Sequence, residues 1–460
     1  MSARPTRPAT ISPARRVALE VLVAVRERDA YANLLLPVLL RRAGLPPAEA
    51  AFATELTYGT LRRLGHYDAV ISAASGREIP AIDPPLLDVL RLAAHQLLAT
   101  RTAAHAAVHQ AVEQAREAAG RGAAGFANAV LRKVGERDDA AWTARLTAGL
   151  DDRIAVLAVE QAHPAWVVAE LEAALARTDG GDADLARLLE VDNVAAPVGL
   201  VALPGLADPA ATGLTRHPLS PIGVESPGGD PGDVPGVRAG SVRVQDPGSQ
   251  LAALALTRAR PIVPGERWLD LCAGPGGKAA LLAAEGAAGG AALTANELLP
   301  ARARLVERAL AAVPGEHTVV IGDGARFATG EDRFDRVLLD APCTGLGALR
   351  RRPEARWRKQ PEDIAELAAT QTRLLDAAVA ALASGGLLAY VTCSPVTAET
   401  EDRVADALDR HPGLEALDTT AVLAGVTTGP LVRARRGTAT QLWPHRHATD
   451  AMFVQLLTRS

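Results

Sequence analysis

The spacing of apolar positions divides the chain into a helical part and a part in which strands and helices alternate. Over residues 12–150 apolar side chains recur three and four positions apart, as with Val17, Val21 and Val25 in "RRVALEVLVAVRER". That spacing places them on one face of a helix. The pattern pauses at Gly120 and then resumes, and no stretch alternates with period two. We therefore predict an all-helical domain over residues 12–150.

From residue 267 onward, short apolar runs are each followed by a helical stretch. The runs "RWLDLC", "AALTANE", "HTVVIGDG", "RVLLDAPC" and "LLAYVTCS" predict strands, and glycines at 286 and 385–386 predict the ends of two helices. Such alternation predicts a doubly wound parallel sheet, so we expect residues 241–460 to adopt a Rossmann-like α/β fold. Residues 151–240 contain helical patterns and then a tract rich in proline and glycine, which predicts a small mixed α/β domain.

Composition narrows the class of protein. The chain has 460 residues and three cysteines, none in a CxxC pair, which argues against a disulfide framework or a zinc cluster. The amino terminus is basic without an apolar run, so we expect no signal peptide. Glycine and proline interrupt a long uncharged stretch, Ala377–Ala398, so it predicts no membrane span. The expectation is a cytoplasmic protein without a bound metal.

The segment "LRRRPEARWRK" (residues 349–359) concentrates positive charge in a chain whose formal net charge is −4. Nucleic-acid binding needs a local basic face rather than a positive total, and an aromatic such as Trp357 among arginines can stack on a base. Such a run is as often an ordinary solvated face. Lysine is rare, with three among 49 basic residues, which makes Lys278 a candidate for a chemical role.

The run "WLDLCAGPGGK" (268–278) predicts a strand, a glycine turn and a helix start, where main-chain N–H groups can approach a ligand. Glu297 lies 20 residues beyond Gly277, where a ribose-binding acid is expected. Asp323 and Asp340 end the next two strands, so carboxylates gather at one edge of the sheet. No phosphate-binding lysine–serine pair follows the loop, which disfavours an NTPase. A nicotinamide cofactor remains an alternative, but the cationic nucleoside S-adenosylmethionine fits these acids better.

Three stretches, "LDLCAGPGGK", "DAPCTGLGALRRRPEARW" and "GGLLAYVTCSP", resemble motifs of the Nol/Nop/Sun family of RNA 5-methylcytosine methyltransferases. "VQDPGSQL" (244–251) and "QLWPHRHATDAMFVQLL" (441–457) resemble its flanking motifs, and "ELTYGTLRR" with "FANAVLRKV" resembles the RNA-binding NusB fold. This fusion, over roughly residues 12–460, is similar to bacterial 16S ribosomal RNA cytosine-C5 methyltransferases. The chain departs from the family at "VAL" (201–203), where Arg-Val-Asn is common, and in the stretch 221–236.

The resemblance implies a role for each candidate residue. Cys393, in the Thr-Cys motif, is implied as the nucleophile that adds to C6 of cytosine, so that C5 can accept a methyl group. Cys343, in the Pro-Cys motif, is implied in product release. DNA cytosine methyltransferases use a Pro-Cys nucleophile instead, so Cys343 is the alternative candidate for the nucleophile. The residues expected to bind S-adenosylmethionine are Cys272 (as a small packing residue), Ala273, Gly274, Pro275, Gly276, Gly277, Lys278, Glu297 (ribose), Asp323 (adenine amine) and Asp340 (amino group).

The expected activity is S-adenosylmethionine-dependent formation of 5-methylcytosine in 16S ribosomal RNA by a monomer. The target cytosine must leave its stack to reach a thiol, which favours single-stranded or loop RNA. A transfer RNA cytosine-C5 methyltransferase is one alternative, against which the NusB-like domain argues. A non-catalytic RNA-binding or antitermination factor is another, and the intact cysteines and acids count against it.

Overall fold

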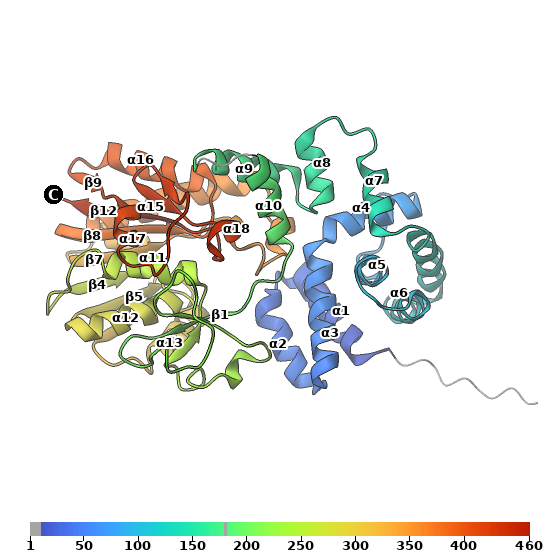
Figure 1. Ribbon diagram of the computed structural model, residues 1–460, viewed down its shortest axis with the longest axis horizontal. Coiled ribbons are helices and arrows are strands. Elements are labelled where there is room, and N and C mark those ends of the chain that lie inside the picture. Colours follow the sequence, from blue (N-terminus) through green and yellow to red (C-terminus); the bar gives the residue numbers. More distant parts are fainter. Residues whose placement is uncertain (1–10, 179–181) are drawn as a thin grey trace, which may run out of the picture. The chain divides into compact units, whose positions relative to one another are not determined.

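The computed structural model describes residues 11–178 and 182–460, which form two compact units (Figure 1). One unit joins the residues up to Ala169 with the distant segment Leu349–Arg358. The other joins Glu170–Ala348 with Lys359–Ser460. Residues 1–10, which belong to the terminus where no signal peptide is expected, lie outside the described residues.

The described part of the first unit consists of helices and loops, as the spacing of its apolar residues predicts. The predicted pause at Gly120 is a kink inside one long helix, where this glycine takes a φ of 85° that other residues rarely adopt. The elements are α1 (Pro13–Arg28), α2 (Ala32–Ala43), α3 (Pro47–Arg62), α4 (Leu64–Ser75), η1 (Ile79–Ala81), α5 (Pro84–Ala99), α6 (Ala104–Val134), α7 (Asp139–Thr147), α8 (Arg153–Glu160) and α14 (Ala355–Arg358).

Two apolar clusters fill the helical unit, and α5 contributes to both. Leu90 packs with Tyr67 and Val130 in one cluster, whereas Leu92 packs with Leu56 in the other. Full burial of a leucine stabilises the fold by about 1.5–3 kcal/mol. Because α5 contacts both clusters, it is buried on more than one side, and most residues in its sequence are therefore apolar.

The segment Leu349–Arg358 is part of the helical unit, although the sequence predicts a basic face there. Arg356 is fully buried and donates to the main-chain carbonyls of Arg62 and Ala162 at 3.1 and 3.0 Å. The indole N–H of Trp357 donates to a carbonyl of α3, and its ring is packed where a Cβ on Gly65 would lie, 2.3 Å away. Arg356 and Trp357 are therefore engaged in hydrogen bonds within the helical unit.

The second unit begins with helices and a small antiparallel sheet. The helices are α9 (Ala165–Ala176), which spans the boundary between the units, and α10 (Asp182–Asp192). β1 (Gly199–Ala202) lies between β2 (Gly223–Glu225) and β3 (Val242–Val244), and η2 (Pro231–Asp233) lies in the loop before β3. Every residue of β1 is buried, so this sheet has an apolar cluster of its own.

Nine strands form the large sheet, in the order β10-β11-β12-β8-β7-β4-β5-β6, with β9 paired to β12. Five of them, from β6 to β8 in this order, are parallel as predicted. β12 pairs antiparallel with β8, β9 and β11, and the sequence analysis missed β9, β11 and β12. The strands are β4 (Arg267–Asp270), β5 (Ala292–Glu297), β6 (His317–Ile321), β7 (Phe334–Asp340), β8 (Leu382–Thr392), β9 (Leu414–Ala416), β10 (Arg435–Arg436), β11 (Ala439–Gln441) and β12 (Phe453–Arg459).

Apolar clusters cover both faces of the large sheet. Neighbouring residues of one strand face opposite ways, so Leu338 joins one cluster and Leu339 joins the other. This two-sided burial is typical of parallel sheets. The accompanying elements are α11 (Pro247–Thr257), α12 (Gly277–Gly289), α13 (Pro300–Leu310), η3 (Gly324–Ala328), η4 (Leu346–Ala348), α15 (Pro361–Ala381), η5 (Thr397–Glu399), α16 (Glu401–Arg410), α17 (Thr419–Ala424) and α18 (Pro444–His447).

Two predicted helix ends are wrong. Gly286 lies inside α12, where a Cβ would lie 3.3 Å from the Trp268 ring. The helix ends at Gly289, and Gly290 caps it in a left-handed conformation. The glycines at 385–386 lie inside β8, because α15 has already ended at Ala381. Within the described residues no single helix is long and apolar enough to cross a membrane; α8 with α9, a bent pair, passes that test by length and composition.

Candidate active site

The parallel strands bring predicted site residues to one edge of the large sheet. β4 ends at Asp270, β5 at Glu297 and β7 at Asp340, and Cys393 follows directly after β8. Because these strands run in the same direction, their carboxyl ends share an edge, where open α/β sheets bind ligands. We call this edge, with the loop Cys272–Lys278, the carboxyl rim.

The loop Cys272–Lys278 connects β4 to α12 through contacts that only glycine allows. A Cβ on Gly274 would lie 2.1 Å from the Glu297 carboxylate, and one on Gly276 would lie 2.5 Å from Ala309. Gly276 also has a φ of 100°. The Gly274 N–H donates to Glu297 at 3.0 Å. The loop therefore brings its main chain close to the start of α12, where N–H groups favour polar or anionic ligands.

Lys278 lies in the first turn of α12 and is almost fully enclosed. Its Nζ donates to Oδ2 of Asp340 at 2.8 Å and to Oγ of Ser249 at 3.2 Å. Burial opposes the ammonium charge, but the Asp340 carboxylate outweighs burial, so the pKa of Lys278 is raised, with a smaller contribution from Cys393. The rim thus holds a fixed positive charge that interacts with both Asp340 and Cys393.

Three buried side chains at the rim have polar atoms without a well-formed hydrogen bond in the described chain: both oxygens of Asp270, both amide atoms of Gln245 and Oδ1 of Asn296. Nε2 of Gln245 lies 3.8 Å from where a Cβ on Gly277 would be. Burial, followed by the charge of Asp340, raises the pKa of Asp270 to about 8. Because buried polar groups are nearly always paired, this set indicates a site for a polar ligand.

These residues fit S-adenosylmethionine. Glu297 is buried at the end of β5 and retains acceptor positions for ribose hydroxyls beyond its two main-chain contacts. Leu298 and Ile321 are large apolar residues left 60% and 48% exposed beside the rim, and they offer apolar surface to a purine. The acids and the amide suit the cationic amino acid end, so each part of the cofactor has residues of matching chemistry.

Asp323 differs from the other predicted acids. It lies in the exposed loop after β6, where it accepts a hydrogen bond from the Ala325 N–H at 3.0 Å and an ion pair from Arg373 at 2.6 Å. The main-chain hydrogen bond and then Arg373 lower the pKa of Asp323. The carboxylate expected to bind the adenine amine is thus already engaged by an arginine.

The two motif cysteines meet at the rim. Their Sγ atoms are 3.5 Å apart, because β7 and β8 pair in a register that aligns Asp340 with Val391. The hydrogen bond to Cys393, followed by burial and the charge of Cys393, raises the pKa of Cys343. Either thiol can be the donor in this contact, and Lys278 lies close enough to Cys393 for their charges to interact. The structure therefore brings the two thiols and one lysine together at the rim.

The third cysteine, Cys272, is held differently. It packs against the apolar cluster that contains Leu269 and Leu271. Burial, followed by the charges of Asp270 and Asp340, raises its pKa. A thiol that keeps its proton in this way is a poor nucleophile, so Cys272 is suited to packing.

Sequence reasoning missed three residues of the site. Asp270 ends the predicted strand "RWLDLC" and Gln245 lies in the quoted "VQDPGSQL", so strand ends and motif membership were available signals. Glu399 lies six residues after Cys393 in η5, and it is fully buried with hydrogen bonds to the Pro-Cys loop. No local pattern indicates that contact, because its partner Thr344 is 55 positions away.

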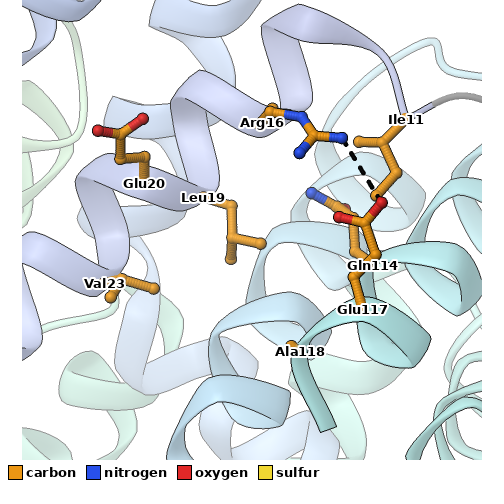
Figure 2. A pocket seen from close by; sticks show the side chains of 8 residues that line it. All are labelled: Ile11, Arg16, Leu19, Glu20, Val23, Gln114, Glu117 and Ala118. Carbon is orange, nitrogen blue, oxygen red and sulfur yellow. Dashed lines mark ion pairs between the residues drawn. The ribbon is translucent and has the colours of Figure 1, made fainter. Parts of the chain in front are cut away.

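Figure 2 shows a second hollow, of about 330 Å³, in the helical unit. Leu19 and Val23 of α1 face Ala118 of α6 across it, and Arg16 pairs with Glu117 at 3.5 Å. Its lining contains no thiol. Among residues 11–178 and 182–460, no group of three or more His, Cys, Asp or Glu side chains could hold a metal ion. The three thiols of the described chain lie instead at the carboxyl rim and its loop.

Two family models match separate parts of the chain. Residues 260–458 match the family described as 16S rRNA methyltransferase RsmB/F, and residues 12–136 match the NusB family. A Mycobacterium tuberculosis protein described as a methyltransferase is 49% identical over 98% of this chain and 97% of its own length. The ribosomal RNA small subunit methyltransferase B of Erwinia tasmaniensis is 30% identical, over 97% of this chain and 98% of its own.

Solved structures share the fold. The crystal structure of PH0851 is 20% identical and superposes with a TM-score of 0.78 over 98% of this chain and all of its own. A methyltransferase homologue from Pyrococcus horikoshii is 22% identical, with a TM-score of 0.52 over 68% of this chain and all of its own. At these identities the likeness concerns the fold alone.

Fold and site together define an S-adenosylmethionine-dependent RNA methyltransferase with a NusB-type helical region. The chain belongs to the RsmB/F methyltransferase family.

Proposed function

We propose that this enzyme forms 5-methylcytosine in 16S ribosomal RNA through a covalent bond between Cys393 and the target base. The observation that carries the proposal is the pair of sulfur atoms 3.5 Å apart at the carboxyl rim. Adjacent ring atoms of one base can meet both thiols at that spacing. The names of the family and of the Erwinia relative support 16S ribosomal RNA as the substrate.

The first half of the reaction makes the base nucleophilic. The Cys393 thiolate adds to C6, and the π electrons of the C5–C6 bond move to C5, which takes the methyl group. Lys278 stabilises the thiolate before attack, and Asp340 holds Lys278 in place. Bound S-adenosylmethionine supplies an electrophilic methyl group on a positively charged sulfur. The loop Cys272–Lys278, Glu297 and Asp270 would hold it at the rim.

The second half releases the product. The C5 proton leaves to a base, its electron pair restores the C5–C6 double bond, and the C6–S bond breaks to return the Cys393 thiolate. Cys343 lies close enough to Cys393 to act at this stage. Its raised pKa makes it a poor competitor for the attack itself. The raised pKa of Cys343 and the charge of Lys278 near Cys393 support separate roles for the two thiols.

Two further features complete the proposal. The NusB-type region favours ribosomal RNA over transfer RNA as the substrate. The enzyme is expected to act as a monomer in the cytoplasm, on a cytosine that is single-stranded or in a loop. Mapping the nucleotide methylated by the purified enzyme distinguishes ribosomal from transfer RNA, and absence of tritium transfer from labelled S-adenosylmethionine to RNA would reject enzymatic activity altogether.

Substitution of each cysteine tests the covalent step. Cys393→Ala should abolish methyl transfer and adduct, and Cys343→Ala should accumulate a protein–RNA adduct on denaturing gels. Adduct that persists in Cys393→Ala would reverse the assignment of the nucleophile.

A further inference from the structure

Glu399 is a fully buried carboxylate between the two cysteine motifs. Its Oε1 accepts hydrogen bonds from the Thr344 N–H at 2.7 Å and from Nε2 of Gln371 at 3.2 Å. Its Oε2 accepts from the Thr344 hydroxyl. The main-chain carbonyl of Glu399 accepts from the Tyr390 hydroxyl at 2.7 Å, which anchors η5 to the sheet.

These contacts hold both sides of Cys343. Thr344 follows it and is bound by Glu399. The carbonyl of Pro342, which precedes it, accepts from the same Gln371 amide at 2.9 Å. The Thr344 hydroxyl also lies 3.0 Å from the hydroxyl of Ser394, the residue after Cys393. One carboxylate therefore links the loop of the first thiol to the loop of the second.

The carboxylate of Glu399 is held by hydrogen bonds. Three donors point at its two oxygens, and among the described residues it forms no ion pair with lysine or arginine. The titratable groups that face it are Cys343, Tyr390 and Glu170. Burial of a polar group costs free energy unless the group is hydrogen-bonded, and an apolar side chain would fill the same space without that cost. The three directional hydrogen bonds therefore indicate that the carboxylate serves to fix the geometry of the loop.

We propose that Glu399 is a positioning residue that fixes the Pro-Cys loop, so that Cys343 stays within reach of Cys393 during product release. This role rests on the proposed function, because it assigns the release step to Cys343. Glu399 touches neither base nor cofactor in this role. It acts through Thr344 and Gln371, whose hydrogen bonds set the position of the main chain on either side of the thiol.

Glu399→Ala and Glu399→Gln test the proposal in full-length protein with 16S ribosomal RNA. Displacement of a reacting group by about 1 Å costs about 100-fold in rate, so Glu399→Ala should lose about that factor in kcat. It should also accumulate the covalent adduct, with the Kd for S-adenosylmethionine within about twofold of the unsubstituted enzyme. Glu399→Gln keeps one acceptor oxygen but not the acceptor for the Thr344 hydroxyl, so it should lose less of the rate and still accumulate adduct. It therefore provides the test if Glu399→Ala does not fold.

Glu285→Gln is the matched control, because Glu285 is a buried carboxylate of the same unit that is hydrogen-bonded to Thr257 and Arg258. It should resolve the adduct normally. If both Glu399 variants resolve the adduct normally, or if they lose cofactor affinity in parallel with rate and trap no adduct, the positioning role is wrong. If Cys343→Ala itself traps no adduct, the proposed function fails, whatever the Glu399 variants do.

Discussion

The segment Leu349–Arg358 lies between the rim residues Asp340 and Cys393 in the sequence, yet the segment and the carboxyl rim use polar side chains in opposite ways. At the rim, buried atoms of Asp270 and Gln245 have no well-formed hydrogen bond in the described chain. In the segment, Arg356 and Arg358 donate to main-chain carbonyls of the helical unit. The first arrangement leaves groups available for a ligand, whereas the second uses them to hold the fold together.

The difference shows how charged residues should be assessed. The segment has the denser charge and looks like the more obvious nucleic-acid surface. Two of its arginines, Arg356 and Arg358, donate to main-chain carbonyls of the same unit, and the Tyr31 ring lies 5.6 Å from the guanidinium groups of both Arg352 and Arg358. The rim has fewer charges, but they lie close to two thiols. One pair, Lys278 with Asp340, is hydrogen-bonded, whereas in the described chain the oxygens of Asp270 have no well-formed hydrogen bond. Buried polar atoms that gather at one sheet edge beside two thiols are thus a better sign of function than the number of charges.

The largest effect that sharpens this comparison is expected at the rim. Lys278→Met should lower methyl transfer by about 100- to 1000-fold, the usual cost of removing a fixed group that stabilises charge at a reacting centre. The rate is measured by single-turnover transfer of a labelled methyl group. Lys359→Met is the control, because Lys359 pairs with Asp363 at 3.7 Å in a more exposed place. Equal losses in the two variants would contradict the assignment.

Substitutions in the segment Leu349–Arg358 should lower the free energy of unfolding. Arg356→Met leaves two buried carbonyls without a donor and should lower the free energy of unfolding by about 3 kcal/mol, measured by denaturant titration. Arg352→Ala, at an exposed stacking position, should cost less than about 1 kcal/mol. The salt dependence of RNA binding by folded Arg356→Met should match that of the unsubstituted protein. A shallower salt dependence would show that Arg356 contacts phosphate and would contradict its assignment as a residue that holds the fold together.

The last effect concerns the pH dependence of stability and is the smallest per pH unit. The pKa of Asp270 is raised from 3.8 to about 8 in the folded protein, so the folded state holds an extra proton between these values. Its contribution therefore makes stability fall as pH rises from about 4 to about 8, by at most about 1.4 kcal/mol per pH unit. Asp270→Asn should remove this part of the slope in thermal melts of ligand-free protein. An unchanged slope would mean that Asp270 ionises normally.

The sequence alone predicted the fold class, and it proposed candidate site residues that the structure brings to one edge of the sheet. Helical spacing predicted the first unit, and strand–helix alternation predicted the five parallel strands, because both periods follow from backbone geometry. Motif order placed Cys343 and Cys393, while the glycine loop with Glu297 indicated the nucleoside site. Asp340 was predicted from the end of its strand in the same way.

Only the tertiary structure decided which polar groups are paired and by what. It placed Arg356 in the helical unit, paired Asp323 with Arg373 and tied Thr344 to Glu399. These contacts join positions far apart in the chain, so no local period or spacing encodes them. Antiparallel β12 escaped prediction for the same reason, since pairing with β8 depends on how the chain returns to the edge of the sheet.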